Sequence, residues 1–183
     1  GEAALYGPKL DFMFKDAMGK DIQIPTIQLD FASPKRFNLQ YTDNNGNLVN
    51  PVMVHRAVLG SYERFLVLLI EYFSGWLPFW LAPEQVRVLT INDSVLDYVD
   101  EVKEVLDKIV LMEPLKYNEL RYSVDSRNES LGKKIREASS CKIPVQIIIG
   151  NKDKDSRQLS IRTKDEEIKI GIEQLEDYLS SRS

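Results

Sequence analysis

The spacing of apolar residues changes at positions 59–60, which marks the clearest boundary between two predicted elements. Residues 51–55 (Pro-Val-Met-Val-His) have the composition of a buried strand. From Ser61 to about Gly75, the apolar residues fall on one face of a helix: Phe65, Leu68, Leu69 and Tyr72. The pattern therefore predicts a strand that enters a helix through Gly60.

Two earlier stretches predict an antiparallel hairpin. Residues 10–14 alternate in polarity, which predicts a half-buried strand with Leu10, Phe12 and Phe14 on its core side. A turn around Gly19 leads to a second strand over residues 22–31. The apolar phase shifts at Pro25, which predicts a bulge or a break there. Beyond Pro25, three polar residues share one face of the strand and can line a pocket: Thr26, Gln28 and Asp30.

Residues 42–47 predict an Asn-Gly turn, so residues 1–75 are expected to be antiparallel sheet plus one helix.

The remainder of the chain predicts a second domain. Residues 76–83 carry two prolines and no periodicity, and we place the boundary near Ala82, between domains 1–82 and 83–183. Strands are expected at 85–91, 120–124, 145–150 and 158–163, and helices at 94–112, 130–139 and 172–179, with Ser94 and Ser130 as caps. This βαβαββα order predicts an α/β domain with a mixed sheet, in a chain that is α+β overall.

Composition is that of a soluble globular protein, with 43% hydrophobic and 28% charged residues. The longest apolar stretch is interrupted at Glu71, Ser74, Gly75 and Pro78, so we expect no membrane span. The single cysteine, Cys141, fits a reducing compartment.

The net charge is −4, yet residues 127–164 hold ten Lys or Arg against four acids. Such a basic region suits a polyanion, although a merely solvated face is the alternative.

Several motifs resemble class II aminoacyl-tRNA synthetases, and the threonyl-tRNA synthetases in particular. They are residues 6–9 (Tyr-Gly-Pro-Lys), 26–31 (Thr-Ile-Gln-Leu-Asp-Phe), 55–65 (His-Arg-Ala-Val-Leu-Gly-Ser-Tyr-Glu-Arg-Phe), 80–83 and 127–136. The third corresponds to motif 3, and together they span nearly the whole chain. The resemblance implies an antiparallel catalytic domain that charges tRNA with threonine, followed by an α/β domain that reads the anticodon.

The resemblance also implies roles for individual residues. His55 corresponds to a zinc ligand, and Zn²⁺ with open positions can bind the amino and hydroxyl groups of threonine. Arg64 corresponds to an arginine that contacts ATP, and Lys9 and Arg64 are the catalytic candidates. The substrate and ATP positions are Tyr6, Lys9, Gln23, Thr26, Gln28, Gly60, Ser61 and Arg64. From the residues alone, the alternatives are a hydrogen-bonded core histidine, a surface ion pair of Arg64 and a solvated sheet face.

In the second domain the resemblance assigns anticodon reading to Asn128, Arg136, Lys142, Asp153 and Arg162. Amide, acid and guanidinium groups are what hydrogen bonding and stacking to loop bases require. The chain departs from the family at Pro25, where a small residue such as Gly is usual, which affects the expected pocket shape. Lys142 and Asp153 stand where Arg and Glu are frequent, which affects only the detail of base reading.

The partners implied are threonine, ATP with Mg²⁺ and tRNA(Thr), in a cytoplasmic or organellar enzyme without membrane association. The other two zinc ligands, motifs 1 and 2 and a homodimer interface are expected upstream of Gly1. The chain is thus expected to be the C-terminal half of a threonine–tRNA ligase and inactive alone. The alternatives are a freestanding, non-catalytic tRNA-binding relative and an unrelated ATP-binding α/β protein, for which every match is coincidence.

Overall fold

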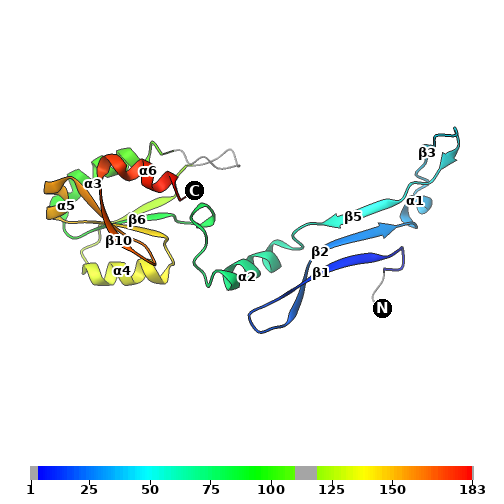
Figure 1. The fold of residues 1–183 in the computed structure, drawn as a ribbon, viewed down its shortest axis with the longest axis horizontal. Coiled ribbons are helices and arrows are strands. Elements are labelled where there is room, and N and C mark those ends of the chain that lie inside the picture. The colour runs from blue at the N-terminus through cyan, green and yellow to red at the C-terminus, as the bar shows by residue number, and fades with distance from the viewer. Residues whose placement is uncertain (1–3, 110–118, 183) are drawn as a thin grey trace. The chain divides into compact units, whose positions relative to one another are not determined.

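The structure is a computed structural model, and it describes residues 4–109 and 119–182 of the chain. The chain divides into two compact units, Gly1–Tyr72 and Phe73–Ser183 (Figure 1). In the described residues, none of the helices combines the length and the apolarity needed to cross a membrane.

The first unit is built on a three-stranded antiparallel sheet. Its strands are β1 (Lys9–Lys15), β2 (Asp21–Asp30) and β5 (Met53–Ala57), with β2 in the centre (Figure 1). The predicted hairpin of β1 and β2 is confirmed. Asp11 pairs with Thr26, but Met13 pairs with Gln23, so β2 has one extra residue between these pairs. The irregularity predicted at Pro25 is therefore a bulge in β2.

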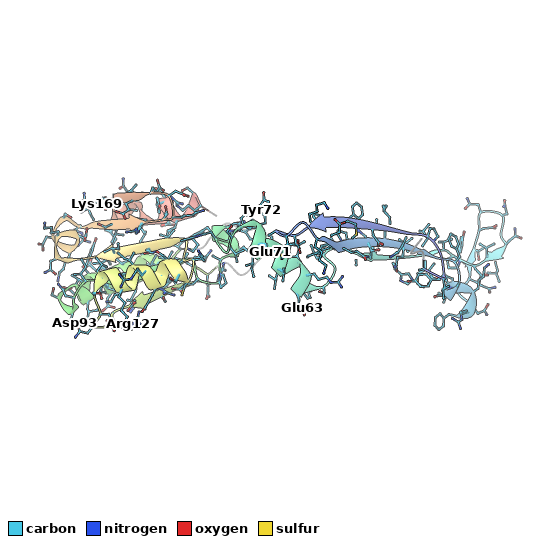
Figure 2. The ribbon with its side chains drawn as sticks, turned by 90° about the horizontal axis from the view of Figure 1, so that it is seen from below. Glu63, Glu71, Tyr72, Asp93, Arg127 and Lys169 are labelled. Atoms are coloured by element: carbon cyan, nitrogen blue, oxygen red, sulfur yellow. The ribbon has the colours of Figure 1, made fainter. Side chains whose placement is uncertain are left out.

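Shorter elements complete this unit. After β2 comes α1 (Ser33–Arg36), which was not predicted because four residues are too few to show a helical period. The hairpin of β3 (Tyr41–Thr42) and β4 (Leu48–Val49) encloses the predicted Asn-Gly turn. The helix predicted after β5 is α2 (Tyr62–Tyr72), whose last turn contains Glu71 (Figure 2). The carboxylate of Glu71 accepts a hydrogen bond from the amide of Ala17 at 3.1 Å, which joins α2 to the β1–β2 turn.

The prediction that Leu10, Phe12 and Phe14 face a core is wrong. Their side chains are 57%, 45% and 49% exposed. On the other face of β1, Lys9 and Asp11 are the less exposed side chains, because they interact with each other and with β2. Alternation identifies the two faces of a strand, but what covers each face depends on tertiary structure.

Gly60 permits the turn from β5 into α2. Its φ angle is +65°, in the left-handed region that favours glycine. A β-carbon at this position would also lie 2.9 Å from the carbonyl oxygen of Ile24 in β2. The predicted change of element at this glycine is confirmed, and the reason is both conformational and steric.

The second unit contains a five-stranded mixed sheet of order β10-β9-β8-β6-β7. The strands are β6 (Val86–Thr90), β7 (Tyr122–Asp125), β8 (Val145–Ile149), β9 (Gln158–Arg162) and β10 (Glu167–Gly171). β6 is parallel to β7 and β8, whereas β9 is antiparallel to β8 and β10. The predicted mixed sheet is confirmed.

Helices cover both faces of this sheet. They are α3 (Leu96–Leu106), α4 (Leu131–Ser140), α5 (Asn151–Ser156) and α6 (Leu175–Ser180), with 3₁₀ turns at Phe79–Leu81, Asp93–Val95 and Ile172–Gln174. Figure 1 shows α3 and α6 on one side of the sheet and α4 on the other. The core is a cluster of buried aliphatic side chains from the strands and from α3 and α6, including Val88, Val102, Ile147, Leu159 and Leu175.

Sequence patterns missed two elements of this unit and misplaced one cap. α5 has the sequence Asn-Lys-Asp-Lys-Asp-Ser, which has no apolar residue to reveal a period, and β10 was also missed. Asn92, rather than Ser94, caps the helical segment, because its side chain accepts a hydrogen bond from the amide of Ser94. Ser130 is at the N-cap position of α4 as predicted, but its side chain makes no capping hydrogen bond. α3 ends at Leu106, and the predicted end at Met112 lies outside the described residues.

We predict that Gly60→Ala lowers the free energy of unfolding by about 3 kcal/mol, from a strained φ angle and an overpacked contact. Gly19→Ala is the matched control, because Gly19 has a φ angle of +79° and an added β-carbon there would meet no atom within 4 Å. The control isolates the conformational cost of about 1 kcal/mol. Denaturant unfolding measures both variants, and equal losses would contradict the steric contribution at Gly60.

Candidate functional site

Three of the predicted site residues form one row across the sheet of the first unit. Lys9 of β1 pairs with Gln28 of β2, and Gln28 pairs with His55 of β5. Directly paired residues of neighbouring antiparallel strands project to the same face. We call Lys9, Gln28 and His55 the polar row.

Tyr6 joins the polar row from the segment before β1. Its hydroxyl donates a hydrogen bond to Oε1 of Gln28 at 2.9 Å. Its ring meets the His55 ring edge to face, with 6.0 Å between the ring centroids. The register of three strands and the contacts of Tyr6 thus bring four predicted site residues together, although they come from separate parts of the sequence.

A second group of polar side chains gathers around the carboxylate of Asp11. Nζ of Lys9 lies 2.7 Å from Oδ2 of Asp11. Nε2 of Gln23 and Oγ1 of Thr26 each donate to Oδ1 at 2.7 Å. The hydrogen bond from Lys9, followed by that from Thr26, lowers the pKa of Asp11 below its usual value. We call these four residues the Asp11 cluster.

Sequence reasoning missed Asp11 itself. The available signal was its place two residues after Lys9, on the same face of the strand. That spacing does not reveal which side chains of β2 lie opposite, so the convergence on one carboxylate is visible only in the structure.

His55 is held by a buried carboxylate. Oδ2 of Asp30 lies 3.0 Å from Nε2 of His55, and the Asp30 side chain is 2% exposed. Oδ1 of Asp30 accepts hydrogen bonds from the amides of Ala32 at 2.9 Å and Ser33 at 2.8 Å. The hydrogen bonds from Ser33, and then that from His55, hold the pKa of Asp30 well below its usual range.

This contact decides which nitrogen of His55 is available. A proton on Nε2 directed at Asp30 leaves Nδ1 with its lone pair, and a second partner of this kind is typical of metal-binding histidines. The His55 side chain is 45% exposed, which does not fit the alternative of a core histidine. Among the residues that the structure describes, no three His, Cys, Asp or Glu side chains come together as a metal site.

Arg64 lies in the first turn of α2. Its amide nitrogen is 3.3 Å from Oγ of Ser61, so the Ser61 hydroxyl satisfies a backbone donor at the helix start. The Arg64 side chain is exposed. Within residues 4–109 and 119–182 its guanidinium forms no ion pair, so the surface-ion-pair alternative is not observed. No described contact joins Arg64 to the polar row.

The five predicted anticodon-reading residues come from separate elements of the second unit. Asn128, in the loop between β7 and α4, and Arg136, on α4, are exposed. Lys142 follows α4 with a φ angle of +59°, and its ammonium lies 5.1 Å from the centroid of the Trp76 ring. Nη1 of Arg162 lies 2.7 Å from Oε1 of Glu167.

Asp153 has a structural role in this unit. Its side chain is 6% exposed, and Oδ2 accepts a hydrogen bond from the Gly150 amide at 3.0 Å, which caps α5. Oδ1 accepts from the hydroxyl of Ser160 at 2.8 Å. A role in base reading would have to be compatible with these bonds, and it stays a prediction.

Half of the ten cations of residues 127–164 form ion pairs inside the unit. Arg127 bridges Asp125 and Glu137. Further ion pairs join Lys133 to Glu129, Lys154 to Asp97, Arg157 to Glu101 and Arg162 to Glu167. In the described part of the chain, the cations of this region without an acidic partner are Lys134, Arg136, Lys142, Lys152 and Lys164. The basic surface is therefore smaller than the sequence indicates.

Lys134 was counted with the basic surface, and this is wrong. Its side chain is 1% exposed, and Nζ donates to the carbonyl oxygens of Thr90 at 2.8 Å and Asp125 at 3.1 Å. Thr90 and Asp125 are the last residues of the parallel strands β6 and β7. Lys134 therefore fixes the point from which the loop with Asn128 begins.

Comparison with known families agrees with this architecture. The family model "Anticodon binding domain" matches residues 85–182, more than half of the chain. The chain belongs to this family. Ahead of the anticodon-binding match, the model "tRNA synthetase class II core domain (G, H, P, S and T)" matches residues 2–73.

Individual relatives confirm the resemblance to threonyl-tRNA synthetases. A threonine–tRNA ligase of Gloeobacter violaceus is 44% identical over 100% of this chain, which covers 28% of that protein. One of Clostridium kluyveri is 44% identical over 98% of this chain and 26% of that protein. The chain thus spans little more than a quarter of the length of the curated relatives that it matches.

Solved structures show the same fold. The RNA binding domain of threonyl-tRNA synthetase from Cryptosporidium parvum superposes with a TM-score of 0.82 at 35% identity, over 100% of this chain and 45% of that one. A putative threonyl-tRNA synthetase from Aeropyrum pernix gives a TM-score of 0.68 at 31% identity, over 100% of this chain and 43% of that one. The predicted fold class is confirmed.

The lowered pKa of Asp30 predicts a specific acid sensitivity of the first unit. A carboxylate with a depressed folded-state pKa stabilises the fold above its unfolded-state pKa, near 4, and this stability is lost as the pH falls towards the folded-state value. We expect the free energy of unfolding to fall below about pH 4 in the wild type and to fall less in Asp30→Asn. Denaturant unfolding between pH 2 and 7 measures this, and parallel curves would contradict it.

Proposed function

We propose that this chain is part of a threonine–tRNA ligase, which activates threonine with ATP and transfers it to tRNA(Thr). Residues 1–82 would contribute the motif 3 part of the catalytic domain, and residues 83–183 would read the anticodon. The observation that carries the proposal is the polar row, because Lys9, Gln28 and His55 share one sheet face with Tyr6. The whole-length similarity to threonine–tRNA ligases supports the same conclusion.

His55 is the residue of this chain that would bind Zn²⁺. Its Nε2 is directed at Asp30, which leaves Nδ1 as the metal-binding atom. The other protein ligands would come from outside the described residues. Bound zinc would act as a Lewis acid that accepts the amino and hydroxyl groups of threonine, and valine lacks that hydroxyl.

The remaining side chains would hold the organic substrates. Tyr6, Lys9, Gln23, Thr26 and Gln28 lie on the polar face of the sheet, where they would bind threonine and the adenylate. Arg64, beside Gly60 and Ser61 at the start of α2, would contact ATP, which binds with Mg²⁺. A guanidinium suits this role because it pairs with phosphate and stacks on adenine. We further propose a homodimer in the cytoplasm or an organellar matrix.

The catalytic test uses the full polypeptide that carries this chain and measures threonine-dependent exchange of pyrophosphate into ATP. His55→Ala and Arg64→Ala are each expected to lower kcat/KM by about 100-fold or more, since they remove substrate contacts. His55→Ala is also expected to lose bound zinc, measured by metal analysis. Arg56→Ala is the matched control, because Arg56 pairs with Ile27 on the opposite face of the sheet.

Retained zinc and exchange rate in His55→Ala would contradict the catalytic proposal. A wild-type polypeptide that binds tRNA but shows no exchange would instead favour the freestanding tRNA-binding relative.

The anticodon-binding proposal predicts different effects for paired and unpaired cations of α4. Arg136→Ala is expected to weaken binding of a tRNA(Thr) anticodon stem-loop and to reduce the salt slope by about 1, because one phosphate or base contact is lost. Lys133→Ala is the control, since Lys133 is already paired with Glu129 at 2.6 Å. Titrations at several salt concentrations measure both variants, and equal effects would contradict the assignment.

A further inference from the structure

We propose that Asp11 is a positioning residue that fixes the reactive orientation of Lys9 and aligns Gln23 and Thr26 beside it. This inference deepens the proposed function and rests on it, because it assigns a role to a residue that contacts the substrate-binding side chains. The juxtaposition of one carboxylate with three candidate ligand-binding groups carries the proposal.

The ion pair with Lys9 is better shielded than a comparable pair on the same strands. The side chains of Lys9 and Asp11 are 18% and 20% exposed, with 2.7 Å between Nζ and Oδ2. Lys15 and Asp21 join β1 and β2 at 3.1 Å, but their side chains are 70% and 58% exposed. Reduced exposure limits solvent screening, so Asp11 restrains the flexible lysine stem more strongly.

The bulge in β2 makes the rest of the cluster possible. Gln23 and Thr26 are three residues apart, so in a regular strand their side chains would project to opposite faces. The extra residue of β2 between their two pairs reverses the phase, and both side chains reach Oδ1 of Asp11. The bulge at Ile24–Pro25 therefore has a specific consequence, which is the convergence of two pocket residues on one acceptor.

This arrangement also orients hydrogen-bonding groups for a ligand. Nε2 of Gln23 donates to Asp11, which leaves Oε1 of the same amide as an acceptor. Lys9 has three N–H donors, and Asp11 fixes the direction of one of them, which constrains the other two. A carboxylate and a lysine held in this way suit a ligand with both anionic and donor groups, as an aminoacyl-adenylate has.

The variant Asp11→Asn separates the ion pair from the other bonds. The asparagine oxygen can still accept from Gln23 and Thr26, but its amide group has no charge to pair with Lys9. Asp21→Asn is the matched control, since it removes the exposed ion pair with Lys15 from the same two strands. Both variants change one carboxylate to an amide of the same size.

The first measurement is threonine-dependent pyrophosphate exchange by the full polypeptide. Asp11→Asn is expected to lower kcat/KM for threonine on the order of 10- to 100-fold, with an increase in KM, and Asp21→Asn less than about twofold. In a Lys9→Met background, Asp11→Asn should add less than about threefold, because its effect passes through Lys9. Multiplicative effects in the double variant, or a wild-type rate in Asp11→Asn, would overturn the inference.

The second measurement does not depend on catalysis. Acetylation of Lys9 by an amine-reactive reagent, followed by peptide mass spectrometry, reports how tightly its ammonium is held. The labelling rate should rise severalfold in Asp11→Asn and stay at the wild-type value in Asp21→Asn. An unchanged rate in Asp11→Asn would overturn the inference. If the wild type shows no exchange, the proposed function fails, and the labelling still decides whether Asp11 positions Lys9.

Discussion

The register of β2 between β1 and β5 is the constraint on which the first unit depends. It sets Lys9, Gln28 and His55 opposite one another, and a slip of one residue would move the side chains of a strand to the other face of the sheet. The same register places the bulge that lets Gln23 and Thr26 share one acceptor. Gly60 then allows the chain to leave β5 close to β2, where any side chain would collide with Ile24.

Two carboxylates convert this register into a defined arrangement of side chains. Asp11 holds Lys9 at one side of the polar row, and Asp30 holds His55 at the other. Each carboxylate accepts several hydrogen bonds that favour its ionised form, which is why both pKa values are lowered. A lysine or histidine without such a partner would sample several rotamers, and the polar face would not be preorganised for a ligand.

In the second unit, many of the charged side chains form ion pairs or hydrogen bonds within the fold. Half of the ten cations of residues 127–164 are paired with acids, some of them on α3, and Lys134 is buried between the ends of β6 and β7. The exposed and unpaired Arg136 then has a larger share in the proposed recognition than the overall count of basic residues indicates. Paired cations release less free energy on binding phosphate, because an existing ion pair must be broken or shared.

The sequence by itself determined the strand–helix unit at Gly60, the β1–β2 hairpin, the bulge at Pro25 and the mixed sheet of the second unit. These features depend on local periodicity and on residues with special backbone conformations, which are properties of neighbouring residues. Motif resemblance placed Lys9, Gln28 and His55 in one site. Only the tertiary structure showed the partners Asp11 and Asp30, the exposed apolar face of β1, the capping role of Asp153 and the burial of Lys134. Each of these depends on which distant residue lies opposite, and the spacing of residues along a chain does not contain that information.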